Sequence, residues 1–120
     1  MRAIRGAITA ENTQTDILEG AEQLLTQIML RNNLAIDDII SITFTCTKDL
    51  NAAYPAAAAR NMGIVRAALM CVQEMDVAGS MAKVVRVCVL AEANTAQTDV
   101  AHVYLRDAAH LRPDLQDEDC

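Results

Sequence analysis

Arg86 lies in surroundings that are unusual for its type, because it is a cation inside an apolar segment, VVRVCVL. Burying an unpaired guanidinium costs free energy, so the side chain needs an anionic partner. The residues alone leave two interpretations open. Arg86 pairs with a structural carboxylate such as Glu74 or Asp76, or it faces a cleft and binds an anionic ligand through its planar set of donors.

Three other polar side chains could serve the same site. Arg5 precedes Gly6, a residue that permits close approach of a ligand or of another backbone, although a surface arginine is the plainer interpretation. Glu74 either is a solvated carboxylate or accepts a hydrogen bond and acts in acid–base chemistry. Tyr104 either packs in the core or donates its hydroxyl into a site.

Cysteine and metal chemistry have less support in the sequence. Cys71 is more typical of a buried small residue, and no base next to it in the sequence favours covalent catalysis. The four cysteines and two histidines match no zinc pattern. We therefore predict reduced thiols and no metal site.

Composition argues against several classes of partner. The net charge is −6 and no basic run is present, so nucleic acid is not an expected partner. No apolar run is long enough to span a membrane and no signal peptide is visible, so we expect a soluble, cytoplasmic protein. Hydrophobic residues make up 52% of the chain and aromatic residues 2%, which predicts an aliphatic core and apolar surface buried in an oligomer.

Two helices are predicted to help position these side chains. Thr13 can cap the first, with Asp16 near the positive end of the helix dipole, and apolar residues follow at helical spacing towards Arg31. The second is short and covers 56–62, where Arg60 complements the negative end of the dipole.

Strands are predicted over residues 2–9, 39–46, 64–72, 82–91 and 102–105. In the second strand, Ile40, Ile42 and Phe44 share one face. In the fourth, both faces are apolar apart from Arg86, so we expect that strand to be buried on both sides. This alternation predicts an α/β or α+β fold in one domain over 1–115. An acidic tail over 116–120 is expected to be mobile.

Several strings resemble, in order, the AroH class of monofunctional chorismate mutases. They are IRGA at 4–7, YPA at 54–56, CVQEMDV at 71–77, VRV at 85–87, HVYL at 102–105 and LRPDL at 111–115. The resemblance covers residues 2–115, and no single string carries it.

The resemblance implies a homotrimer whose subunits form a pseudo α/β-barrel, with mixed sheets in the centre and helices outside. One active site would lie in each cleft between neighbouring subunits, which suits a small chain with little room for a private pocket. The implied reaction rearranges chorismate to prephenate in aromatic amino acid biosynthesis, with no cofactor and no covalent intermediate.

The resemblance also implies roles for residues of one subunit. Arg5 and Arg86 would bind the substrate carboxylates, and Arg86 would also bind the ether oxygen. Glu74 would accept a hydrogen bond from the ring hydroxyl. Cys71 would line the site beside Glu74, and Tyr104 would bind a carboxylate.

Other implied site residues lie at the edge of the cleft. Tyr54 and Arg60 would come from the adjacent subunit, while Leu111 and Arg112 would sit at the mouth. Two positions depart from the family pattern: Ala57 stands where some members have a lysine, and Met70 stands where a threonine often precedes the cysteine. These departures bear on substrate affinity more than on the reaction.

Two alternatives remain at this stage. A trimeric ligand-binding or regulatory protein on a similar scaffold would need Arg5 and Arg86 but not Glu74. An enzyme of the trimeric enamine and imine deaminase type also uses an arginine in clefts between subunits, but its characteristic strings are not found in this sequence.

Overall fold

The computed structural model describes residues 1–111, so Arg112 and the predicted tail over 116–120 lie outside the described residues. Within the described part, five strands form one mixed sheet in the order β3-β2-β4-β1-β5. The strands are β1 (Arg2–Thr9), β2 (Ile39–Cys46), β3 (Ala68–Gln73), β4 (Val84–Ala91) and β5 (Val103–Leu105). The α-helices are α1 (Gln14–Arg31) and α2 (Ala56–Asn61), and three short 3-10 helices are η1 (Ile36–Asp38), η2 (Gln97–Asp99) and η3 (Arg106–His110).

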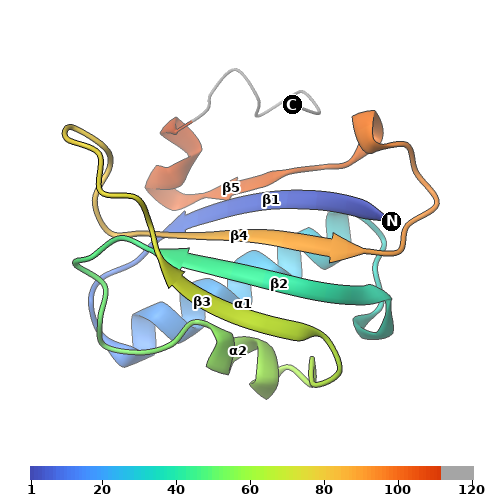
Figure 1. Ribbon diagram of the computed structural model, residues 1–120, viewed down its shortest axis with the longest axis horizontal. Coiled ribbons are helices and arrows are strands. Elements are labelled where there is room, and N and C mark those ends of the chain that lie inside the picture. Colours follow the sequence, from blue (N-terminus) through green and yellow to red (C-terminus); the bar gives the residue numbers. More distant parts are fainter. Residues whose placement is uncertain (112–120) are drawn as a thin grey trace.

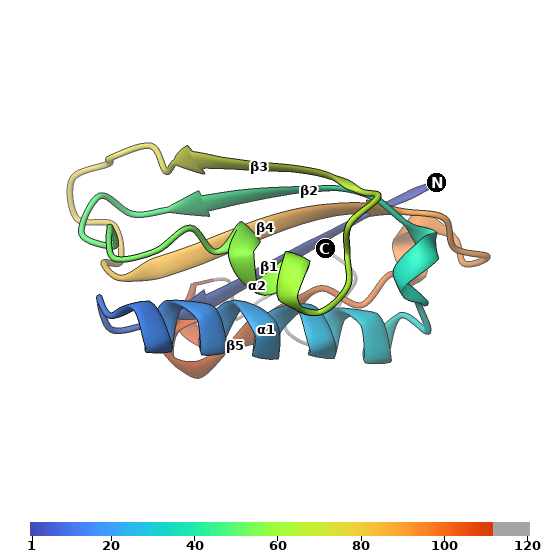
Figure 2. The ribbon, with the colours of Figure 1, turned by 90° about the horizontal axis from the view of Figure 1, so that it is seen from below.

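The two α-helices lie on the same face of the sheet (Figures 1 and 2). On the opposite face, Ala108 of η3 packs with Ala7 and Tyr104 at one end. β4 pairs antiparallel with β1 and with β2, whereas β5 and β3 add parallel strands at the two edges. The fold is therefore of the mixed α and β class that the sequence predicts.

The first helix forms as its sequence predicts. The side chain of Thr13 accepts a hydrogen bond from the backbone N–H of Asp16 at 3.0 Å, which satisfies one of the free donors at the helix start. The apolar stripe of α1 is buried against the sheet, with Ile17, Leu24 and Ile28 at most 1% exposed. This burial holds the long helix across β1 and β5.

The covered face of the sheet carries the aliphatic core. Val85, Val87 and Val89 of β4 and Phe44 of β2 are all buried there. In β2 the predicted face was wrong at its first residue: a register shift lies between Ile39 and Ser41, so Ile39 is buried and Ile40 is 37% exposed. A β-bulge inserts one residue, which reverses the inward and outward alternation before it.

Three predicted strands begin later than expected, β5 by one residue and the other two by more. β3 begins at Ala68 rather than at residue 64, because Gly63 (φ +92°) ends α2 and the N–H of Ile64 still bonds to the helix carbonyl of Ala59 at 3.0 Å. β4 begins at Val84 because Lys83 is left-handed, with φ +59°, which is incompatible with a strand.

The expectation that β4 is buried on both sides is wrong for the single chain. On its second face Cys88 is exposed, and Arg86 and Leu90 are only partly buried. We call this side of the sheet, which neither α1 nor α2 covers, the open face. Its residues, from cross-strand register, are Ala3, Arg5 and Ala7; Ser41, Thr43 and Thr45; Ala68, Met70 and Val72; Arg86, Cys88 and Leu90; and Tyr104.

Candidate active site

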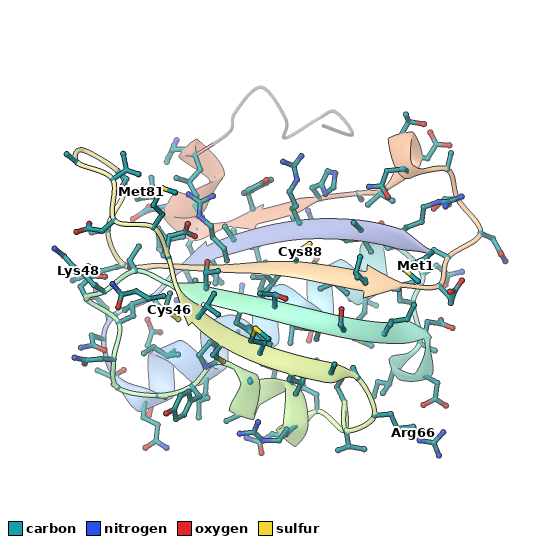
Figure 3. All side chains as sticks on the ribbon, in the orientation of Figure 1. Met1, Cys46, Lys48, Arg66, Met81 and Cys88 are labelled. Carbon is teal, nitrogen blue, oxygen red and sulfur yellow. The ribbon has the colours of Figure 1, made fainter. Side chains whose placement is uncertain are left out.

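Arg86 lies at the middle of a cross-strand row on the open face. Ala7 and Thr45 are its partners on the two neighbouring strands, and Tyr104 and Val72 extend the row to the sheet edges. Directly paired residues share a face, so these side chains project to the same side. Figure 3 shows this face towards the viewer, with Cys88 labelled between β1 and β4.

A cavity of about 280 Å³ opens on this face around Arg86. Four of the predicted site residues line it together: Arg5, Glu74, Arg86 and Tyr104. Its other lining residues are Gly6, Thr43, Thr45, Val87 and Cys88. Residues far apart in the sequence thus meet in one hollow because β4 lies between β1 and β2.

Arg86 and Glu74 form an ion pair inside this cavity. Arg86 Nε lies 3.1 Å from Glu74 Oε1, and the side chains are 41% and 27% exposed. The distance satisfies an ion pair, but the N–H does not point at the oxygen: Nε is buried and has no hydrogen-bond partner among the described residues. Both interpretations of Arg86 therefore apply: it pairs with a carboxylate of the protein, and it keeps a buried N–H donor that could bind a ligand.

Asp76, the other carboxylate considered for Arg86, lies elsewhere. Its Oδ2 pairs with Lys48 Nζ at 3.0 Å, on the exposed side of the loop after β3. This ion pair raises the pKa of the exposed Lys48 above its ordinary value, chiefly through the hydrogen bond from Lys48 to Asp76. Within the described residues, Glu74 is therefore the carboxylate that meets Arg86.

Glu74 is held by β2 through two contacts. Its backbone N–H donates to the carbonyl of Cys46 at 2.8 Å, and its Oε1 accepts a hydrogen bond from Thr45 Oγ1 at 2.7 Å. Sequence reasoning missed Thr45. A usable signal was present in the alternation of Ser41, Thr43 and Thr45, which puts a line of hydroxyls on the face opposite the core.

Arg5 is positioned by a histidine that the sequence analysis left without a role. The backbone N–H of Arg5 donates to His102 Nδ1 at 2.9 Å, and His102 is 7% exposed. Gly6 serves the helix rather than a ligand: a Cβ at this position would lie 2.9 Å from Ile28 Cδ1 and 3.0 Å from Leu24 Cδ1. The small residue lets α1 pack closely under the strand that carries Arg5.

Three predicted site residues lie outside the cavity in the single chain. Cys71 pairs with Phe44, so it projects to the covered face of the sheet, where it packs partly buried against the core. Tyr54 is 73% exposed and lines a separate hollow of about 250 Å³ together with Cys71. Arg60 is exposed on α2.

A second thiol in that hollow is chemically quiet. Burial, reinforced by the nearby Cys71, raises the pKa of Cys46 to about 11. Because the thiolate is the reactive form, Cys46 stays protonated at neutral pH. Cys46 therefore does not act as a thiolate beside Cys71.

Leu111 is the last predicted site residue that the structure describes. It packs against a small cluster at one end of the open face, formed by Ala7, Val84, Tyr104 and Ala108. Leu111 does not itself line the cavity, although Tyr104, a member of this cluster, does. Arg112, the next predicted residue, is outside the described residues.

Residues 1–111 offer neither a metal site nor a membrane-spanning helix. No cluster of three or more histidine, cysteine or acidic side chains able to hold a metal ion occurs in that range. In the same range, no helix combines the length and apolar character needed to cross a bilayer.

Comparison with known proteins gives consistent matches along nearly the whole chain. The family model described as chorismate mutase type I matches residues 1–115. The chain is 42% identical over 118 residues to "Chorismate mutase AroH" of Thermus thermophilus, covering 97% of each. It is 38% identical over 117 residues to the protein of the same name from Bacillus subtilis (strain 168), covering 96% of this chain and 92% of that one.

A solved structure matches as well. "Chorismate mutase from Clostridium thermocellum" superposes with a TM-score of 0.87 at 50% sequence identity, and the match covers 88% of this chain and 96% of that one.

Proposed function

The chain belongs to the type I chorismate mutase family, and from that premise we propose that the cavity around Arg86 and Glu74 is where it acts on chorismate. Family membership makes the protein an isomerase that rearranges chorismate to prephenate in aromatic amino acid biosynthesis. The ligand-binding and deaminase alternatives lose their support, because the family match runs along residues 1–115.

The chemistry asks little of the enzyme beyond geometry and charge. One C–O bond breaks and one C–C bond forms within the same molecule, so no proton donor, nucleophile or cofactor has to enter the reaction. The enzyme must hold the enolpyruvyl arm over the ring, which is an orientation effect. It must also stabilise the negative charge that develops on the ether oxygen as the C–O bond breaks.

Arg86 is the residue that we assign to the developing charge. The observation that carries this proposal is its buried Nε, which has no hydrogen-bond partner among the described residues and lies in the cavity beside Glu74. A fixed guanidinium in a partly enclosed hollow stabilises an anion more than solvent does. Glu74, on the same wall, would accept a hydrogen bond from the ring hydroxyl.

Two other cavity residues would bind the substrate carboxylates. Arg5 and Tyr104 line the cavity on the β1 and β5 side of Arg86 and would contact these groups. Leu111 and Arg112 would cover the mouth. This assignment treats residues 1–115 as a single domain; the mobile tail over 116–120 and the cytoplasmic location stay predictions.

We further propose that the site is completed by a neighbouring subunit in a homotrimer with its sheets in the centre and helices outside. Apolar side chains on the open face support this, since Met70 is 60% and Val72 is 42% exposed in the single chain. The outward positions of Tyr54 and Arg60 also support it, because side chains pointing away from their own cavity are free to line a neighbour's. Cys71 would line the site in this assembly.

Subunit mixing tests the shared site. Arg86→Ala and Arg60→Ala chains are each expected to lose most turnover, measured as loss of chorismate absorbance. The two variants are then refolded together in equal amounts. In a closed trimer, a site is intact when an Arg60→Ala chain supplies its Arg86 and the neighbouring Arg86→Ala chain supplies its Arg60, which random mixing gives at about a quarter of the sites. Turnover should then rise to about that fraction of the unmutated enzyme.

A matched mixture controls for unspecific rescue. Arg86→Ala mixed with Glu74→Ala should regain nothing, because both residues would come from the same subunit. Absence of rescue in the first mixture, or equal rescue in both, would contradict a site built from Arg86 of one chain and Arg60 of the next.

A further inference from the structure

We infer that Thr45 is a positioning residue for the reaction: its hydroxyl fixes the carboxylate of Glu74 so that the second carboxylate oxygen is presented to the substrate. The inference rests on the proposed function, because it takes Glu74 to be the acceptor for the ring hydroxyl. Thr45 is not among the site residues that the family resemblance implies.

The contact itself is short and partly buried. Thr45 Oγ1 donates to Glu74 Oε1 at 2.7 Å, within the normal range for a charge-assisted O–H to carboxylate bond. Thr45 is also the direct partner of Arg86 on the neighbouring strand. One β2 residue therefore touches the carboxylate and lies beside the cation, and all three side chains line the same cavity.

Glu74 needs the contact from Thr45 because it lies just beyond the end of β3. It follows Gln73, the last residue of β3, so no strand neighbours fix its side chain. Its backbone is tied to β2 by the bond to the carbonyl of Cys46. The side chain of Glu74 has three rotatable bonds, and a single ion pair restricts them only in part.

The ion pair with Arg86 does not fix the orientation of the Glu74 carboxylate. Its Nε is close to Oε1 but its N–H is poorly aimed, so the ion pair is compatible with several carboxylate orientations. The Thr45 hydroxyl is directional, and the β-branched side chain has few rotamers. Both contacts use Oε1, and Oε2 carries no hydrogen bond from the described residues. Oε2 is therefore the oxygen available to a substrate hydroxyl.

A double-mutant cycle tests whether Thr45 acts through Glu74. Thr45→Val removes the hydroxyl and keeps the branched shape, and it should lower kcat for chorismate about tenfold or more with a smaller change in KM. In a Glu74→Ala background, the same Thr45→Val change should alter kcat by less than about twofold, because there is no carboxylate left to position. Equal losses in both backgrounds would overturn the inference.

Two further variants separate positioning from packing. Thr45→Ser keeps a donor and should restore kcat to within about threefold of the unmutated enzyme. Ser41→Ala is the matched control, since Ser41 presents a hydroxyl on the same strand and face but does not line the cavity and makes no hydrogen bond to Glu74 among the described residues. Ser41→Ala should leave kcat nearly unchanged, and a loss as large as that of Thr45→Val would mean that the effect of Thr45→Val does not depend on the hydrogen bond to Glu74.

The outcomes also separate this inference from the proposed function. If Glu74→Ala by itself turned over chorismate normally, the role assigned to Glu74 would be wrong. If Glu74→Ala were inactive while Thr45→Val stayed fully active with unchanged melting temperature, only the positioning role of Thr45 would fall.

Discussion

Arg86 illustrates how one side chain can be both held and available. Its long stem follows an apolar strand, its guanidinium meets Glu74, and its Nε is buried without a hydrogen-bond partner among the described residues. A buried donor without an acceptor costs free energy in the empty enzyme. A ligand oxygen placed there would recover that cost, which favours an anionic group at this position.

Replacing Arg86 by lysine tests the need for a guanidinium. Arg86→Lys keeps the positive charge but loses the planar set of donors. We expect kcat to fall roughly 10²–10³-fold, the loss of about 2.7–4 kcal/mol seen when one preorganised donor is removed from an active site. The loss of chorismate absorbance at saturating substrate, followed by stopped-flow or steady-state kinetics, measures kcat. The melting temperature serves as control, and an active variant with normal kcat would remove Arg86 from the chemical step.

At the scale of elements, the start of β4 is held by a small polar cluster. Lys83 adopts its left-handed conformation while its N–H donates to both carboxylate oxygens of Asp49, at 3.1 and 3.2 Å. Thr47 donates to the same carboxylate at 2.5 Å, and its Oγ1 accepts the N–H of Val84 at 3.0 Å. Together these bonds fix where β4 begins, two residues before Arg86.

This cluster makes a pH-dependent prediction. The hydrogen bond from Thr47 is the main cause that holds the pKa of Asp49 below its usual value. A carboxylate with a lowered folded-state pKa adds stability above its unfolded value of about 3.9, and this stability is lost as the pH falls through the folded-state pKa. Asp49→Asn should therefore lower the free energy of unfolding, measured by urea titration at pH 7, by less than about 1 kcal/mol for a partly exposed group. This difference should shrink as the pH falls below about 3.9 and through the folded-state pKa of Asp49.

The comparison needs fixed subunit concentration, because an oligomer's apparent stability depends on it. A difference between Asp49→Asn and the unmutated protein that stays constant from pH 7 to pH 3 would mean that the charge of Asp49 does not contribute. Rearrangement activity should fall in parallel if the start of β4 places Arg86.

At the scale of the whole molecule, the proposed assembly depends on the open face. Among the described residues, both α-helices lie on one side of the sheet and η3 covers one end of the other side (Figure 2). The rest of that other side exposes Met70, Val72 and Cys88 beside the cavity. Uncovered apolar patches on a sheet are typical of protein interfaces. The same face carries Arg86, so assembly and activity should depend on each other.

Leu90→Glu tests this dependence. Leu90 lies on the open face of β4, two pleats from Arg86, and does not line the cavity. A buried, unpaired carboxylate at an interface is costly, so we expect the variant to sediment as smaller species and to lose turnover at low protein concentration. Leu30→Glu is the control, because Leu30 is 69% exposed on α1, on the helical side of the sheet. An unchanged mass and full activity for Leu90→Glu would argue against the open face as the subunit interface.

Much of the local structure follows from the sequence for a physical reason. The stripe of α1, its Thr13 cap and the extended β1 depend on residues close together in the chain, so periodicity predicts them. The start of β4 was misplaced because the left-handed Lys83 is held by Asp49, a residue distant in sequence. The family was also readable in the sequence, through strings spread from residue 4 to residue 115.

The site depended on long-range pairing that no local pattern contains. Periodicity identified the apolar faces of β4, but the sheet order and the helices decided that one face is covered and the other is open. The same register put Thr45 beside Arg86 and turned Cys71 to the covered side, away from the cavity. The sequence by itself determined which residue types and elements the chain has and to which family it belongs. Only the tertiary structure decided which of those residues meet, because a strand's neighbours are set by contacts between distant segments of the chain.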